Sequence, residues 1–272
     1  MLGLGTAINR GEFVSAGEPL FLDTYPGATA AYSLRQLSAS YSGPLIRIRR
    51  DGDNAEIDVK ASSGVVDSAA IAAHCGSFDG SVVTIYDQSG NSRDATAINT
   101  AYQPKIYDGS TGVVTEGSRL AMESIQDAFE ATPFAVSQLY AIHVGNLTFA
   151  NATGLFGAYN VYNDFVGWTG VGWRFRPFVS DFVGTKPVGQ SSIHLYSTLT
   201  NGSAAYVNNV LNGSTGNSNP SETMTIKALN GIESGVWPGV GKLQEIIIYD
   251  GDQTANRLEM ERDINAFYDI YT

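Results

Sequence analysis

The sequence predicts an all-β protein in which two antiparallel sheets pack face to face as a sandwich. Eight stretches of alternating or continuously apolar residues are separated by glycine-rich turns, and the chain has 30 glycines in 272 residues. With 43% hydrophobic and 16% charged residues, the composition is that of a globular chain with a sizeable core. One all-β domain can hold the whole body, since such domains often exceed about 150 residues.

The first 24 residues show little periodicity, and they precede a predicted domain at residues 25–272. Two interpretations are open for residues 1–24. They are either a flexible arm that docks onto another protein or a terminal strand that closes the sandwich.

Two short helices are predicted before the main run of strands. Residues 28–37 favour a helix because Leu34 and Leu37 are three apart, with Tyr41 one turn further. Residues 67–74 form the second, where Asp67 or Ser68 can cap the first turn before a glycine ends the helix.

The predicted strands continue to residue 249, and a helix ends the chain. The run 246–249 is apolar throughout and indicates a central strand covered on both faces, while Asn201 and Gly202 predict a tight hairpin turn. A terminal helix beginning near Thr254 carries Ile264 and Phe267 on one side. The strands are predicted at residues 81–87, 138–146, 154–159, 172–179, 192–199, 204–211, 223–229 and 243–249.

Charge and cysteine content exclude several classes of protein. A net charge of −11 opposes binding to a phosphate backbone, so nucleic acid is not an expected partner. Residues 47–50 hold three arginines, which form either a salt-bridged strand face or a phosphate or sugar site. The single cysteine, Cys75, predicts folding in a reducing cytoplasm. Neither a signal peptide nor about 18 consecutive apolar residues is present, so we expect neither conventional export nor a membrane span.

Motifs in residues 28–108 resemble the opening half of the catalytic domain of fungal-type α-L-arabinofuranosidases. That domain is a concanavalin A/laminin-G-like β-sandwich, or jelly roll, which also recurs in tailed-phage structural proteins, so the resemblance implies the same fold here. Residues 205–213 and 241–249 look like later strands of laminin-G-like domains. The matching residues are Tyr32, Leu34, Arg35, Arg47, Arg49, Arg50, Asp53, Asn54, Tyr86, Asp87, Gln88, Ser89, Gly90, Arg93, Asp94, Ala95, Gln103, Pro104 and Ile106.

The chain departs from the enzymes where their chemistry lies. The enzymes pair a cysteine near the place of Cys75 with a second one and carry a vicinal cysteine pair, and those partners are missing here. No Asp or Glu aligns onto their catalytic carboxylates. We therefore assign no catalytic residue, although four acids lie in suitable loops or strand ends for the carboxyl pair that glycoside hydrolysis uses: Asp164, Asp181, Glu222 and Glu233.

The best ligand-binding candidates are aromatic and arginine side chains, because aromatic faces stack on sugar C–H groups and guanidinium groups donate to hydroxyls or carboxylates. The alternative is an ordinary half-buried strand, because Trp173 and Phe175 alternate with Arg174 and Arg176. A structural turn motif, in which Asp87 caps backbone N–H groups, is expected at Tyr86, Asp87, Gln88, Ser89 and Gly90. The ligand-binding candidates are Trp168, Trp173, Arg174, Arg176 and Trp237.

Three scattered histidines lack the spacing of metal ligands, and no nucleotide fingerprint is present, so we expect neither metal nor cofactor. The leading hypothesis is a phage virion structural protein: a head-decoration, head-fibre or tail-associated subunit made in the host cytoplasm and displayed on the particle surface. Its partners would be other virion proteins, reached through the N-terminal arm, and surface glycans, and we expect a homo-oligomer. The alternatives are an arabinofuranosidase-like glycosidase or depolymerase, and a free carbohydrate-binding module.

Overall fold

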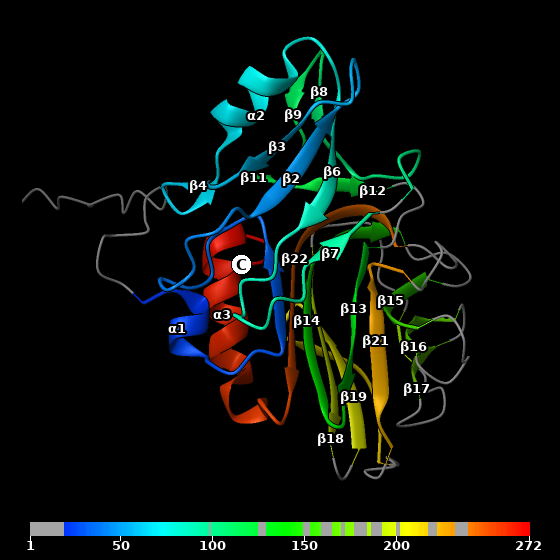
Figure 1. The fold of residues 1–272 in the computed structure, drawn as a ribbon. Coiled ribbons are helices and arrows are strands. Elements are labelled where there is room, and N and C mark those ends of the chain that lie inside the picture. Colours follow the sequence, from blue (N-terminus) through cyan, green and yellow to red (C-terminus); the bar gives the residue numbers. More distant parts are fainter. Residues whose placement is uncertain are drawn as a thin grey trace, which may run out of the picture.

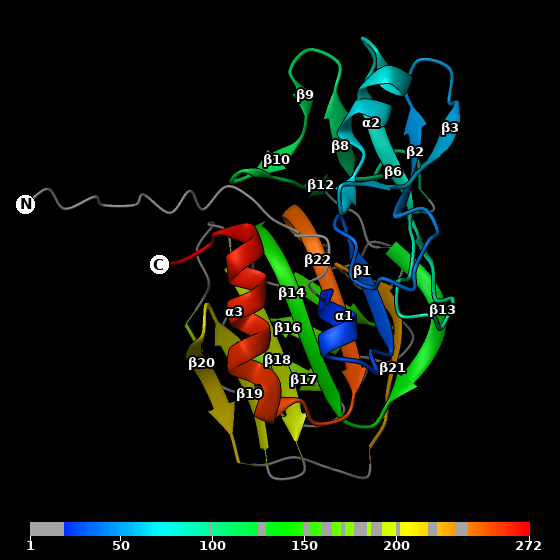
Figure 2. The same cartoon turned by 90° about the vertical axis from the view of Figure 1, so that its left-hand side faces the viewer.

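The structure is a computed structural model in which strands of the chain curl into one large antiparallel sheet with helices on its outer face (Figure 1). Figure 2 shows helix α3 (Arg257–Tyr268) lying along β14 (Leu139–Thr148) and β22 (Val240–Asp250). Helix α2 (Ser68–Cys75) lies at the far end of the molecule, with β2 (Ile46–Arg50), β3 (Glu56–Val59), β6 (Gly80–Ile85) and β8 (Lys105–Asp108). The structure describes residues 19–97, 99–124, 129–148, 153–158, 165–169, 172–176, 184–185, 192–199, 202–216, 222–231 and 239–272.

The helices of the described residues are α1 (Phe21–Thr24), α2 (Ser68–Cys75), a 3-10 turn (Thr254–Asn256) and α3 (Arg257–Tyr268). The strands of the first half are β1 (Ala30–Ser33), β2 (Ile46–Arg50), β3 (Glu56–Val59), β4 (Ala61–Ser62), β5 (Val65–Val66), β6 (Gly80–Ile85), β7 (Ala95–Thr96), β8 (Lys105–Asp108), β9 (Gly112–Val113), β10 (Thr115–Glu116), β11 (Arg119–Leu120) and β12 (Met122–Ser124). Those of the second half are β13 (Phe129–Val136), β14 (Leu139–Thr148), β15 (Thr153–Gly157), β16 (Phe165–Trp168), β17 (Trp173–Arg176), β18 (Ser192–Leu199), β19 (Gly202–Val207), β20 (Val210–Thr215), β21 (Met224–Leu229) and β22 (Val240–Asp250).

Strands β14 and β22 form the centre of the sheet and are buried on both faces. They pair antiparallel, with Ile142 opposite Ile247, and β22 also pairs with β1 and β12. Along each strand, alternate side chains enter two different apolar clusters: Ile246 faces the inner cluster, and Ile247 faces the outer cluster beneath α1 and α3. The predicted central strand at residues 246–249 is therefore confirmed.

The prediction of a concanavalin A/laminin-G-like jelly roll is wrong, although the all-β antiparallel class is right. Among the described residues, hydrogen bonds join 18 strands into a single curled sheet, not into two separate ones. Register shifts in β13 between Glu130 and Phe134 and in β14 between Val144 and Gly145 interrupt the ladder, and such bulges bend strands and increase their twist. Strand patterns in a sequence show which face is apolar, but they do not show which strands pair.

The predicted helix at residues 28–37 is also wrong. Residues 30–33 form β1, in which Ala30 and Tyr32 face the inner cluster while Ala31 faces the outer one. Pairing with β22 supplies the backbone partners, so tertiary contacts override a local helical pattern. The helix of this region lies earlier, at α1, where Phe21 and Leu22 are buried in the outer cluster. Residues 21–24 of the predicted arm thus pack on the body, and its residues 1–18 lie outside those described.

The two other predicted helices are confirmed. Asp67 caps α2 by accepting hydrogen bonds from the N–H groups of Ala69 and Ala70, both at 3.0 Å. Helix α3 follows the 3-10 turn and buries Ile264 and Tyr268. Within the described part of the chain, no helix is long and apolar enough to cross a membrane.

Candidate functional site

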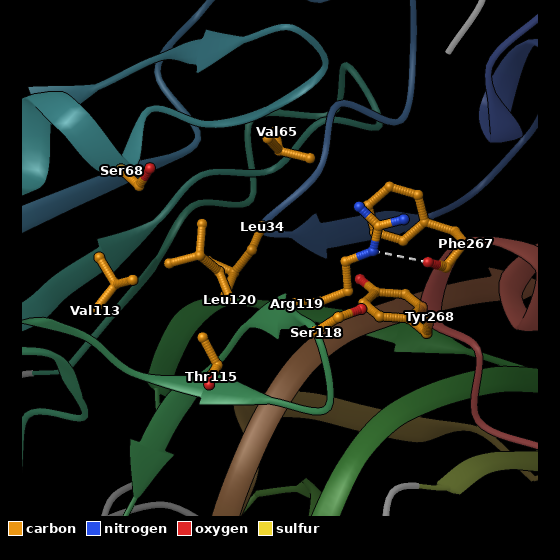
Figure 3. Close-up of a pocket in the computed structure, with 10 residues that line it drawn as sticks. All are labelled: Leu34, Val65, Ser68, Val113, Thr115, Ser118, Arg119, Leu120, Phe267 and Tyr268. Carbon is orange, nitrogen blue, oxygen red and sulfur yellow. Dashed lines mark hydrogen bonds between the residues drawn. The ribbon is translucent and has the colours of Figure 1, made fainter. Parts of the chain in front are cut away.

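A cavity of about 220 Å³ lies where the end of the molecule that carries α2 meets the C-terminal end of α3 (Figure 3). One wall is aliphatic and comes from Leu34 after β1, Val65 in β5, Val113 in β9 and Leu120 in β11. The hairpin of β10 and β11 forms the floor. The remaining lining residues are Ser68, Thr115, Ser118, Arg119, Phe267 and Tyr268.

Arg119 is the cation of this cavity, and its guanidinium group is held by two contacts with one residue. Its Nε donates a hydrogen bond of 2.8 Å to the backbone carbonyl of Phe267, and its Cζ lies 4.2 Å from the centre of the Phe267 ring. The Phe267 ring therefore covers one face of the guanidinium. None of the salt bridges formed by the described residues involves Arg119.

A buried ion pair supports the wall behind Phe267. Both oxygens of Glu245, which is fully buried, accept hydrogen bonds from Arg35, at 2.7 and 2.9 Å. Ser33 Oγ and the Tyr268 hydroxyl also donate to Glu245, at 2.8 and 3.2 Å. Burial opposes the charge of Arg35, but the neighbouring Glu245 carboxylate outweighs it and raises the pKa of Arg35. Burial and the same carboxylate raise the pKa of Tyr268.

The chemistry of the cavity is that of a binding site. Its lining combines one guanidinium, hydroxyl groups and aliphatic carbon, and it contains no Asp, Glu, His or Cys. A pair of carboxyl groups about 5.5 Å apart is what retaining glycoside hydrolysis needs. The cavity can therefore hold a ligand but does not supply such a pair.

A second cavity, of about 500 Å³, lies between α1 and the turn that follows β6. Its polar lining is already engaged within the protein. Asp23 accepts a hydrogen bond of 3.0 Å from Ser38 Oγ, and Gln88 Oε1 accepts one of 2.8 Å from the Leu37 N–H.

The turn motif at residues 86–90 ties this second region to β1. Asp87 Oδ1 accepts from the N–H groups of Ala31 and Ser89, both at 2.9 Å, and Asp87 Oδ2 accepts from the Arg93 N–H at 3.0 Å. Tyr86 donates from its hydroxyl to Asp58 at 2.7 Å, and Gly90 takes a φ of +87°. The carboxylate and amide groups of this motif are thus used in joining segments of the backbone.

The structure brings together two of the predicted ligand-binding residues, but inside the protein. Trp168 in β16 and Trp173 in β17 are 2% and 0% exposed, and their rings meet edge to face with centres 5.4 Å apart. Trp173 Nε1 donates a hydrogen bond of 2.7 Å to Asn212 Oδ1. Arg174 is half-buried, Arg176 ends β17, and Trp237 lies outside the described residues.

Of the four acidic candidates, only Glu222 lies among the described residues, so the structure does not show a pair. Glu222 is exposed and lies just before β21, whereas Asp164, Asp181 and Glu233 lie outside the described residues. The described part of the chain contains no group of three or more His, Cys, Asp or Glu side chains that could hold a metal ion. The arginines at residues 47–50 form salt bridges, Arg47 with Asp58 at 2.8 Å and Arg50 with Asp53 at 2.6 Å, as one of the two sequence interpretations proposed.

Sequence reasoning did not find Arg119 or its cavity. Arg119 lies in a two-residue strand next to a glycine turn, and so short a strand has no periodic signal. The residues that line the cavity with it come from distant positions, among them 34, 65 and 267. The only local hint was the apolar side of the terminal helix, which includes Phe267.

Part of the chain matches a known family of proteins. Residues 23–128 match the family described as "Alpha-L-arabinofuranosidase B, catalytic". α-L-Arabinofuranosidase B of Emericella nidulans is 36% identical over 100 residues, which are 34% of this chain and 19% of that enzyme. A probable α-L-arabinofuranosidase B of Aspergillus clavatus is 30% identical over 99 residues, 35% of this chain and 20% of that protein. The match therefore spans about a fifth of each curated relative.

Solved structures extend the likeness of fold to most of the chain. A variant of a GH54 α-L-arabinofuranosidase soaked with 4-nitrophenyl α-L-arabinofuranoside has a TM-score of 0.64 at 16% identity, over 89% of this chain and 63% of that one. An arabinofuranosidase complexed with arabinofuranosyl-α-1,2-xylobiose has a TM-score of 0.60 at 14% identity over the same shares.

These comparisons confirm the resemblance to arabinofuranosidase B and overturn the leading functional hypothesis. The prediction of a phage virion structural protein is wrong, because the matched family and both curated relatives are glycoside hydrolases. That prediction treated the missing cysteine partners as a loss of enzyme chemistry. In the structure, however, Cys75 is a buried residue of the inner cluster, so the fold accommodates it as an ordinary apolar side chain without a disulfide.

Proposed function

We propose that this protein is a glycoside hydrolase that removes α-L-arabinofuranosyl groups from oligosaccharides or polysaccharides. The observation that carries the proposal is the match of residues 23–128 to the catalytic domain of arabinofuranosidase B. The likeness of fold over 89% of the chain supports it, since the chain continues past the matched stretch with the same architecture.

The reaction requires two carboxyl groups on opposite sides of the glycosidic bond, one to protonate the leaving oxygen and one to act as nucleophile or base. The fully buried Glu245 and the buried Asp87 are unsuitable, because each is bonded to several groups of the protein itself. The candidates for the catalytic pair are the acids whose sequence positions fall in the connections around β16–β18 and β21. The four candidates are Asp164, Asp181, Glu222 and Glu233.

Hydrolysis of 4-nitrophenyl α-L-arabinofuranoside by the full chain tests the proposal, with release of 4-nitrophenol followed by its absorbance. Wild type should turn over, and two of the variants Asp164→Asn, Asp181→Asn, Glu222→Gln and Glu233→Gln should each lose about 10²- to 10⁴-fold in kcat. Glu259→Gln, which changes a 65%-exposed carboxylate on α3, should keep the wild-type rate.

Two results would overturn the proposal. One is a folded wild-type protein that hydrolyses neither this substrate nor arabinofuranosyl-substituted xylo-oligosaccharides. The other is a wild-type protein that binds such oligosaccharides but does not turn them over, which would identify a carbohydrate-binding module. Turnover that survives all four substitutions together would overturn the assignment of the catalytic pair.

A further inference from the structure

We infer that the cavity around Arg119 is a binding site for a single carboxylated sugar, of the uronic acid class. The inference does not rest on the proposed function, because the cavity lacks carboxyl groups and its occupation can be measured without hydrolysis.

Charge is the first argument for a carboxylate. The chain carries 27 acidic and 16 basic residues, and the described salt bridges pair Arg35, Arg47, Arg50 and Arg257 with carboxylates. Arg119 forms none of these bridges and lines a cavity. Its Nε is bound to the Phe267 carbonyl, so its two Nη groups form the edge that can donate to a ligand.

Preorganisation is the second argument. The hydrogen bond and the stacked Phe267 ring hold the guanidinium of Arg119 in place, so little side-chain freedom is lost when a ligand binds. A planar guanidinium edge matches a carboxylate through two parallel hydrogen bonds. Arg35 stacks on the same ring at 4.7 Å, but Glu245 neutralises it, which leaves one net cation for a ligand with one charge.

The rest of the lining indicates the body of the ligand. Leu34, Val65 and Leu120 offer aliphatic surface to C–H groups, whereas Ser68, Thr115 and Ser118 offer hydroxyls that can donate and accept (Figure 3). A simple aliphatic or aromatic acid would leave these hydroxyls unused. A sugar ring presents both C–H and O–H groups, so a uronic acid satisfies all three kinds of lining.

The size of the cavity limits the ligand to one ring. Pockets for drug-sized molecules measure about 300–1,000 Å³. The volume here is about 220 Å³, which suits a monosaccharide unit, with any further units of a chain left outside.

Isothermal titration of the full-length protein with sodium glucuronate and sodium galacturonate tests the inference. At least one of them should bind, glucose and arabinose should bind at least ten-fold more weakly, and so should acetate and benzoate. Arg119→Gln should weaken uronate binding about ten- to a hundred-fold, the usual range for a hydrogen bond to a charged group. Arg262→Gln removes the same charge from a 68%-exposed position of α3 and should leave binding unchanged.

Arg119 also anchors the end of α3, so a second variant guards against misfolding. Ser118→Ala leaves that anchor in place and should weaken uronate binding a few-fold, while wild type should gain thermal stability on adding uronate. The inference is overturned if neither uronate binds at 10 mM, if glucose binds as well as glucuronate, if acetate or benzoate binds as well as the uronates, or if folded Arg119→Gln binds like wild type.

Discussion

Glu245 shows how a charged residue can be placed inside this sheet. It lies on β22 with no exposed surface, and Arg35, Ser33 and Tyr268 supply its four hydrogen bonds. A buried pair of this kind is costly to break because the remaining partner keeps its charge in a medium of low polarity.

Glu245→Gln should destabilise the protein by about 3 kcal/mol, since Arg35 would then lie beside a neutral amide. Urea unfolding followed by far-UV circular dichroism measures the change. Glu259→Gln, at an exposed ion pair of 3.8 Å, should change the free energy of unfolding by less than about 0.5 kcal/mol. Equal effects of the two substitutions would contradict the importance of burial at Glu245.

His143 predicts a loss of stability in mild acid. It is fully buried on β14, and burial lowers its pKa to about 4 from 6.5. Between these values the unfolded chain binds a proton that the folded protein does not, so stability is complete above pH 6.5 and falls as the pH falls toward 4. His143 should account for roughly 2 kcal/mol of loss between pH 7.5 and 5.

Urea unfolding at pH 7.5, 6 and 5 measures this slope. His143→Gln should unfold with a smaller pH dependence than wild type, whatever its stability at pH 7.5. An unchanged slope in His143→Gln would show that other groups cause the acid sensitivity.

At the residue scale, sequence reasoning succeeded where the partner is local and failed where it is distant. Asp67 caps a helix two and three residues ahead, which a sequence pattern contains. Arg119 meets Phe267 across 148 residues, a contact that no local pattern contains. Trp168 and Trp173 are close in the sequence, but the fold places both rings inside the core rather than at a surface. Aromatic and arginine content indicated stacking, but only the fold decides which face of a strand is exposed.

The end of α3 is set by a residue in the left-handed region. Asp269 has φ 53° and ψ 53°, and its N–H donates a hydrogen bond of 2.8 Å to the Asn265 carbonyl. Glycine adopts this backbone conformation at no steric cost, whereas a side chain with a Cβ pays for it.

Asp269→Gly should stabilise the protein by about 0.5 kcal/mol, and Asp269→Ala should destabilise it by a similar amount. Ala266→Gly, at an exposed position inside α3, should cost about 1 kcal/mol because glycine is a poor helix former. Thermal unfolding of the three variants gives the order. If Asp269→Gly is less stable than wild type, the left-handed C-terminus is not a source of strain.

At the element scale, helices with a cap and a clear apolar side were predictable, as α2 and α3 show. Residues 28–37 satisfied a helical pattern, but residues 30–33 form β1, because the edge of β22 offers hydrogen-bond partners about 215 residues away. Strand β13 had no predicted counterpart. It contains a proline and exposed residues between buried ones, so its pattern alternates only in part.

At the scale of the whole molecule, the inner cluster links both ends of the structure. It contains Cys75 of α2 at one end and Trp168 and Trp173 of the β16–β17 hairpin at the other (Figure 1). A core that is continuous between two regions should make them unfold together.

Thiol labelling of Cys75 and tryptophan fluorescence should give the same urea midpoint. Cys75 is the single cysteine of the chain and is fully buried, so its labelling reports the opening of the α2 end alone. Brief labelling pulses at each urea concentration measure that opening. A labelling midpoint well below the fluorescence midpoint would show that the α2 end unfolds independently.

The sequence supported the all-β class because alternation and turn residues are local properties. It could not show the number of sheets. The single curled sheet of eighteen strands among the described residues is set by pairing and bulges between distant segments. The motifs in residues 28–108 indicated the arabinofuranosidases. Treating the missing cysteines as a sign of missing activity led to the wrong functional hypothesis.

The pairing of β1 with β22 has a consequence for the protein's synthesis. Ala30 lies opposite Ile248, so the first strand of the sheet leaves the ribosome long before its neighbour exists. At about 5–20 residues per second, β1 waits for β22 for roughly ten seconds to a minute, and β14 waits for about half as long. During that time their apolar edges are open to other chains. A nascent chain that stops before residue 240 can never cover them, so interrupted translation should yield aggregates and not partly folded protein.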